Sequence, residues 1–256
     1  MNIENVVGIA GDWHGDLPWA LNSVRIFSEA GVKDILHLGD FGIFSDPEGD
    51  AYLESVSDDV RSLNMRILVT PGNHEDYTRI NATPLSPDGL QWITDVIAVM
   101  PRGFRWEVSG RTFVSLGGAA SVNFPDLKEG ISWWREEAIT AGDIYRLADG
   151  GPADVMLAHD APIGISTLKN SHRTGNKWSL EGLAYSDESR RMMSAAVDIV
   201  RPMMFFHGHY HLDYRETVMM GGGALTFDVD FIGMNMNGRE RNLGVLDATS
   251  LKFTYL

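Results

Sequence analysis

Five short segments carry side chains of the types that bind metal ions in proteins, and each follows a hydrophobic run. In chain order they are Asp12-Trp13-His14, Gly39-Asp40, Gly72-Asn73-His74-Glu75, His159 and Gly208-His209-Tyr210-His211. Mixed carboxylate, imidazole and amide donors suit Mn, Fe, Zn or Ni better than an all-oxygen Ca or Mg site. The set is large enough for two neighbouring ions, and two ions are one way to make water attack a phosphorus ester at neutral pH.

The hydrophobic pattern predicts the strands and helices that position these segments. In the first half, strands at 6–10, 34–38 and 65–69 alternate with helices at 18–30 and about 51–63, which favours a parallel sheet. The second half is richer in strands, at 111–116, 154–158, 203–206, 243–246 and 251–255, with helices at 136–147 and 186–200. We therefore expect two sheets packed together with helices outside, in one domain over residues 1–256.

All five polar segments lie at the carboxyl ends of predicted strands, which is the edge where open α/β sheets bind ligands. Within them, Asp12 and His14 are two residues apart, as are His209 and His211. Alternate side chains of an extended segment point the same way. We therefore expect each pair to face one pocket.

Composition excludes several classes of protein. The net charge of −14 and the pI near 4.9 argue against stable binding of duplex nucleic acid, although bound cations would still allow a phosphate substrate. There is no cysteine, which excludes disulfides and thiolate ligands. No apolar stretch has membrane-spanning length, and the first residues lack the basic region of a signal peptide. These features predict a cytoplasmic protein.

The ordered series D-x-H, GD, GNHE, H and GHxH resembles the calcineurin-like metallophosphoesterases, particularly small phage and bacterial phosphodiesterases. The similarity extends from Asp12 to His211, and GNHE together with GHYH is its most specific part. The resemblance implies the metallo-dependent phosphatase fold, an α/β fold of four layers, α/β/β/α, in which helices flank two mixed sheets. It also implies an enzyme that hydrolyses phosphoric esters.

The same resemblance implies a role for each matching residue. Ligands of the first metal would be Asp12, His14 and His211; ligands of the second would be Asn73, His159 and His209. Asp40 would bridge the two ions, for which Mn²⁺ is our first choice and Fe, Zn or Ni the alternatives. His74 would contact the phosphoryl group, beside Asn73, or protonate the leaving oxygen. A hydroxide shared by the metals would attack phosphorus in line with the leaving alkoxide.

One stretch departs from the pattern of the Ser/Thr protein phosphatases in this superfamily. Those enzymes carry GD-x-x-D-R-G, whereas this chain has Ile43 in place of the second Asp and lacks the adjacent Arg. The departure disfavours a protein phosphatase. It also leaves open which carboxylate orients His74, with Asp46, Glu75 and Asp76 as candidates.

Three further side chains are candidates for contact with substrate. Trp13, beside the metal ligands, could stack on a nucleobase. In the basic stretch 169–178, Arg173 or Lys177 could meet a second phosphate or a base, although a solvated loop explains that stretch equally well. His37 and His207 lie in predicted strands, where packing or support of the ligands is the simpler interpretation.

Three functions fit this pattern. The first is a two-metal phosphodiesterase for small phosphoesters, including nucleotides such as cyclic nucleotides. The second is a phosphomonoesterase or Ser/Thr protein phosphatase at the same site, and the third is a non-catalytic scaffold that retains the fold. The complete ligand set disfavours the scaffold, and the missing D-R-G element favours the phosphodiesterase.

Overall fold

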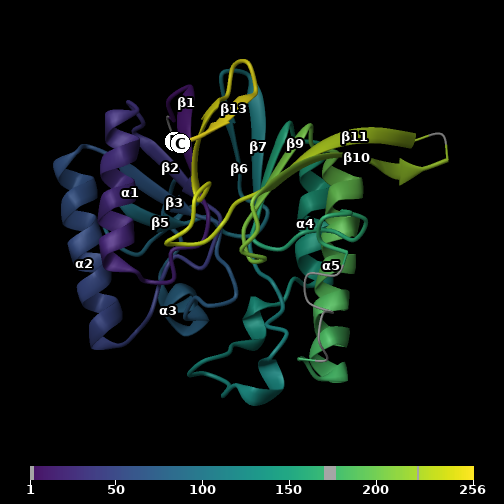
Figure 1. Ribbon diagram of the computed structural model, residues 1–256, viewed down its shortest axis with the longest axis horizontal. Coiled ribbons are helices and arrows are strands. Elements are labelled where there is room, and N and C mark those ends of the chain that lie inside the picture. The colour runs from purple at the N-terminus through teal and green to yellow at the C-terminus, as the bar shows by residue number, and fades with distance from the viewer. Residues whose placement is uncertain (1–2, 170–176, 224) are drawn as a thin grey trace.

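Two β-sheets pack face to face, and helices cover the outer face of each (Figure 1). The computed structural model describes residues 3–169, 177–223 and 225–256. Both sheets contain parallel and antiparallel pairs. The expected four layers and the two mixed sheets are therefore confirmed.

The first sheet has the strand order β13-β12-β1-β2-β3-β5-β4. Its parallel strands are β1 (Val6–Ala10), β2 (Asp34–His37), β3 (Arg66–Val69) and β5 (Ile97–Val99). Antiparallel strands at its edges are β4 (Gln91–Trp92), β12 (Leu243–Asp247) and β13 (Lys252–Tyr255). Helices α1 (Leu17–Glu29) and α2 (Pro47–Ser62) cover its outer face, and the short α3 (Tyr77–Ala82) follows β3 (Figure 1).

The second sheet has the order β10-β11-β9-β8-β7-β6. Its strands are β6 (Arg105–Val108), β7 (Arg111–Leu116), β8 (Val155–Ala158), β9 (Met204–His207), β10 (Tyr214–Gly222) and β11 (Leu225–Gly233). Helices α4 (Ala141–Gly150) and α5 (Leu180–Val200) cover it, and the turns η1 (Phe124–Asp126) and η2 (Arg135–Glu137) lie between β7 and α4. None of the helices in the described ranges is long and apolar enough to cross a membrane.

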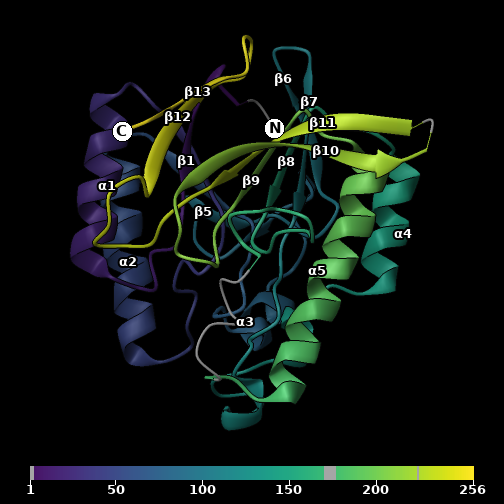
Figure 2. The same cartoon turned by 45° about the vertical axis from the view of Figure 1, so that its right-hand side comes forward.

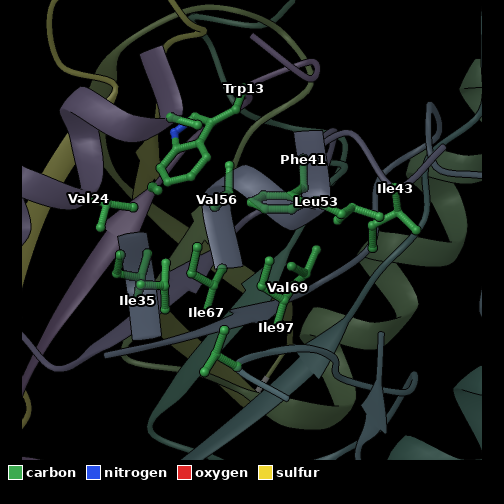
Figure 3. Close-up of a cluster of buried hydrophobic side chains, with 14 of the residues drawn as sticks. Trp13, Val24, Ile35, Phe41, Ile43, Leu53, Val56, Ile67, Val69 and Ile97 are labelled. Carbon is green, nitrogen blue, oxygen red and sulfur yellow. The ribbon is translucent and has the colours of Figure 1, made fainter. Parts of the chain in front are cut away.

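Alternation along the central strands builds the core as three buried layers. In β2, Ile35 packs toward α1 and α2, whereas Leu36 packs between the sheets. In β8, Leu157 packs between the sheets and Met156 packs toward α4 and α5. Figure 3 shows the layer beneath α1 and α2. Because both faces of these strands are buried, they appear in the sequence as continuous apolar runs.

Capping side chains move two helix starts away from their predicted positions. Thr140 and Asp143 form a capping box, so α4 begins at Ala141, and the preceding residues form the separate turn η2. The predicted start at residue 136 was wrong. Ser179 caps α5 by accepting a hydrogen bond from the backbone N–H of Gly182, so this helix begins six residues earlier than predicted.

The hairpin of β10 and β11 was missed in the sequence. It projects past α5 in both ribbon views (Figures 1 and 2). In β10 the alternation is imperfect, because Val218, Met219 and Met220 are consecutive apolar residues. In β11, however, apolar residues alternate regularly with polar ones from Leu225 to Phe231, and three glycines at 221–223 mark a turn, so the sequence did carry a hairpin signal. The short strands β4, β5 and β6 were also missed.

Candidate metal centre

The five polar segments meet at one edge, where parallel strands of both sheets end. Asp12, Asp40 and Asn73 follow β1, β2 and β3 of the first sheet. His159 follows β8, and the pair His209 and His211 follows β9 of the second sheet. The expected convergence of these side chains is thus present in the structure.

The side chains form two groups that share one carboxylate. The first group is Asp12, His14, Asp40 and His211; the second is Asp40, His159 and His209. Within each group the ligand atoms lie within 4.8 Å of one another. Asn73 adds an amide oxygen to the second group, because its Oδ1 lies 3.2 Å from His159 Nε2. Each group has the donor types and the spacing that could hold one divalent ion.

Asp40 presents one oxygen to each group. Its Oδ2 lies 3.5 Å from His14 Nε2, and its Oδ1 lies 3.2 Å from His159 Nε2. The backbone N–H of His74 also donates to Oδ1 at 2.9 Å, which fixes the rotation of the carboxylate. A carboxylate held in this way could contact two ions at once.

Hydrogen bonds on the far side of two imidazoles set which nitrogen faces the carboxylates. His159 Nδ1 bonds the backbone oxygen of Leu38 at 2.6 Å, and His14 Nδ1 lies 2.9 Å from Asn237 Oδ1. Both contacts place the N–H on Nδ1 and leave Nε2 to face the centre. Asn237 lies in the loop after β11 and was missed, because nothing near it in the sequence marks a ligand.

Four expected ligands have left-handed backbone conformations, with φ of 50° at His14, 51° at Asp40, 67° at His209 and 53° at His211. Non-glycine residues rarely adopt this region, but Asp and His tolerate it better than most. We had expected each pair to face a pocket because its segment is extended, and that reason was wrong: the backbone at these residues is not extended. Tight turns orient these side chains, and they send His209 and His211 to different groups.

Two glycines allow the loops to approach the ligands closely. A Cβ at Gly72 would collide with Asp40 Oδ1, and a Cβ at Gly208 would collide with Asp12 Oδ1. Any side chain at either position would occupy space that a ligand oxygen now fills. Glycine at these two positions therefore leaves the space that the carboxylates of Asp40 and Asp12 occupy.

Glu75 joins the two loops that carry the central ligands. Its buried carboxylate accepts backbone N–H groups from Gly72 in its own loop, and from Asp40 at 3.2 Å and Phe41 at 2.6 Å in the loop after β2. Burial and the charge of Asp40 raise the pKa of Glu75 to about 7, while His159 and the backbone N–H groups oppose that rise. The carboxylate of Glu75 thus accepts hydrogen bonds from the backbone and does not orient the imidazole of His74.

His74 is exposed and belongs to neither ligand group. Its ring centre lies 5.9 Å from that of His14. The other two carboxylates considered as its partner have different roles, because Asp46 caps α2 and Asp76 caps α3. The place of the missing second Asp is taken by Ile43, which is buried in the core layer of Figure 3.

A chain of hydrogen bonds from Glu137 orients the amide of Asn73. Ser121 Oγ donates to Glu137 Oε2 at 2.8 Å and therefore accepts from Asn73 Nδ2 at 3.1 Å. This arrangement turns Asn73 Oδ1 toward His159. Ser121 follows β7 and Glu137 ends η2, and neither was anticipated because they reach the site only through the fold.

The charges of Asp40 and Asp12 raise the pKa values of the imidazoles of His14 and His159. Burial lowers the pKa of His14, but the hydrogen bond and charge of Asp40, with the charge of Asp12, outweigh it and raise the pKa to about 9. At His159 burial is again outweighed by Asp40, and the pKa rises to about 10. Burial and the nearby charge of His159 hold the pKa of His209 well below its ordinary value. Without metal, protons on two imidazoles therefore balance the carboxylates.

Trp13 does not reach the cavity, so its expected stacking on a nucleobase was wrong. Its ring is fully buried in the core layer of Figure 3, and its Nε1 donates to Asn242 Oδ1 at 3.1 Å. His37 packs against this ring at 4.7 Å between centres, and His207 is also buried. These two histidines thus have the packing role expected of them. Arg173 lies outside the described residues.

A cavity of about 380 Å³ opens on the centre. The residues of the polar segments that line it are Asp40, Asn73, His74, His209 and His211. The remaining lining comes from the segment after β7, from α5 and the segment before it, and from the loop after β9, namely Ser121, Val122, Asn123, Lys177, Trp178, Ser186 and Tyr210. A larger cavity of about 490 Å³ beside α5 contains none of the expected ligands.

Comparison with known proteins gives a family and a fold. The family model described as calcineurin-like phosphoesterase matches residues 6–213. TT1561 of Thermus thermophilus is similar in structure, with a TM-score of 0.55 and 12% identity over 99% of this chain and 98% of that one. A dimetal phosphatase from Danio rerio, LOC 393393, has a TM-score of 0.54 and 12% identity over 94% and 91%. No curated protein sequence matches.

Metal binding should release protons, because His14 and His159 must lose theirs before they coordinate an ion. With pKa values of about 9 and 10, both are protonated near neutral pH. The apparent affinity for Mn²⁺ should therefore rise with pH, to about pH 9 at the site that contains His14 and to about pH 10 at the site that contains His159. Calorimetry in buffers of different ionisation enthalpy should count two protons released, one from each imidazole. Binding without proton release would contradict this assignment.

Ser121→Ala should weaken one metal site and spare the other, because it frees the amide of Asn73 to rotate. Loss of such an orienting bond typically lowers metal affinity about 10- to 100-fold. Titration with Mn²⁺ should resolve one weakened and one unchanged site. Ser62→Ala, an exposed serine of α2, is the matched control. Two unchanged sites in the Ser121 variant would show that the hydrogen-bond chain does not position Asn73.

Proposed function

The chain belongs to the calcineurin-like phosphoesterase family, and from this membership we propose that it is a metal-dependent phosphodiesterase for small nucleotides such as cyclic nucleotides. The observation that carries the proposal is the pair of ligand groups joined through the two oxygens of Asp40. A scaffold would have no need of a complete donor set.

The donor sets fit two divalent ions. One ion would be held by Asp12, His14, Asp40 and His211, and the other by Asp40, Asn73, His159 and His209. Mn²⁺ is our first choice, with Fe, Zn or Ni as alternatives. Bound ions of this kind supply Lewis acidity, which activates water and stabilises charge on the phosphoryl oxygens.

His74 is the proposed general acid. Its side chain is exposed in the cavity beside His14, whereas its backbone is fixed by the hydrogen bond to Asp40. It can therefore reach a substrate without coordinating an ion. In this role it donates a proton to the leaving oxygen as the ester bond breaks, and Asn73 lies beside it to contact the phosphoryl group.

Apart from the two proposed ions, the side chains that line the cavity carry little positive charge, which favours a diester over a monoester. A phosphate monoester carries about −1.5 to −2 charge near pH 7, whereas a diester carries about one negative charge. Among the described residues that line the cavity, Lys177 supplies the cationic side chain and there is no arginine. Ile43, buried where the protein phosphatases carry Asp, supports the same choice.

Hydrolysis of two p-nitrophenyl esters tests the proposal. Metal-free protein supplied with Mn²⁺ should hydrolyse bis-(p-nitrophenyl) phosphate faster than p-nitrophenyl phosphate, and 2′,3′- and 3′,5′-cyclic nucleotides should be compared in the same assay. Asp40→Ala should abolish turnover, because it removes a ligand from both groups. Preference for the monoester would indicate a phosphomonoesterase or protein phosphatase, and no turnover with two ions bound would indicate a scaffold.

His74→Asn should separate proton donation from metal binding. Because His74 lies in neither ligand group, the variant should keep both ions while kcat falls about 10²- to 10⁴-fold. Metal content and kcat measured on the same preparation would check this. Loss of an ion would mean that His74 is a ligand.

A further inference from the structure

Trp178 differs from the other tryptophans in its surroundings. The other six pack in the hydrophobic clusters or against aromatic rings: Trp13, Trp19, Trp92, Trp106, Trp133 and Trp134. Trp178 belongs to none of the three clusters of the described chain, is half-buried, and lines the cavity that contains His74, His209 and His211. A large aromatic side chain at that position contributes little to the core and is available to a ligand.

Lys177 is paired with this ring. Its Nζ lies 4.4 Å from the centre of the Trp178 ring, within the range of a cation–π interaction. Both side chains line the same cavity. The ammonium group covers one face of the indole, so a planar group that enters the cavity would stack on the opposite face.

The rest of the lining suits a group that is planar and polar at its edge. Val122 offers an apolar surface, and the amide of Asn123 can both donate and accept hydrogen bonds. A volume of about 380 Å³ is in the range of pockets for small molecules. The cavity thus combines a phosphoester site with a place for one attached aromatic group.

We propose that Trp178 and Lys177 bind the nucleobase of a nucleoside phosphoester whose phosphoryl group lies at the metal centre. Trp178 supplies the stacking surface, and Lys177 holds the ring in place. This inference rests on the proposed phosphodiesterase function and adds a determinant of substrate class. It assigns to Trp178 the stacking role that the sequence had suggested for Trp13.

Two diesters with the same leaving group isolate the effect of the base. Thymidine 5′-(p-nitrophenyl phosphate) and methyl p-nitrophenyl phosphate both release p-nitrophenolate, and only the first carries a nucleoside. Trp178→Leu should lower kcat/KM for the nucleoside ester about 5- to 150-fold, as expected for loss of one base–aromatic stack. The methyl ester should be unaffected, and Trp178→Phe should retain much of the preference.

Leu180→Ala is the matched control, because Leu180 lies two residues away, is 86% exposed and does not line the cavity. It should change neither rate. An equal loss on both esters in Trp178→Leu would indicate a structural role for the ring, and no loss on either would also overturn the inference. Unfolding midpoints of the variants should match that of the unaltered protein.

Measuring the binding of thymidine 5′-monophosphate tests the stacking role of Trp178 separately from the proposed phosphodiesterase activity. If the unaltered protein with Mn²⁺ hydrolyses neither ester, the proposed function fails. Calorimetric titration with the nucleotide then still tests the stacking site, since Trp178→Leu should weaken binding about 5- to 150-fold while inorganic phosphate binds both proteins equally. Equal affinity of both proteins for the nucleotide would overturn the inference.

Discussion

The buried carboxylate of Glu75 accepts N–H groups from the loops after β2 and β3, and the geometry of the centre follows from that contact. Those loops carry Asp40 and Asn73, which serve the ligand groups, and His74. Backbone N–H groups buried without an acceptor would be costly. The carboxylate of Glu75 accepts hydrogen bonds from these groups in both loops and so fixes the distance between the two loops. The positions of Asp40 and His74 relative to each other are thus set by the backbone before any ion binds.

The centre places two buried negative charges close together, and protonated histidines compensate them. Asp12 and Asp40 are both buried at the sheet edge, in a protein whose net charge is already −14. Protonated His14 and His159 compensate the carboxylates when no ion is bound. The site is therefore built for cations, and an acidic protein can present a positive pocket to phosphate once the ions replace the protons.

The sequence was informative where function depends on strand ends and failed where it depends on side-chain direction. Asp12, Asp40 and His159 could be predicted because each follows a continuous apolar run. Trp13 and Trp178 were not distinguished, because the burial of Trp13 in the core layer and the place of Trp178 in the cavity lining are set by the packed fold. Ser121 and Glu137 come to Asn73 only through packing of the second sheet, which no local pattern describes. The β10–β11 hairpin was missed although β11 alternates apolar and polar residues, as a half-buried strand does.

The left-handed backbone at His14, Asp40, His209 and His211 limits how the centre can be altered. Aspartate, asparagine and histidine are the residues that both tolerate this conformation and donate to metals. Cysteine, glutamate or a β-branched residue at the same four positions would add backbone strain to any change in coordination. Backbone conformation and donor chemistry therefore select the same narrow set of side chains. Redesign of this centre toward thiolate-binding metals would have to rebuild its turns first.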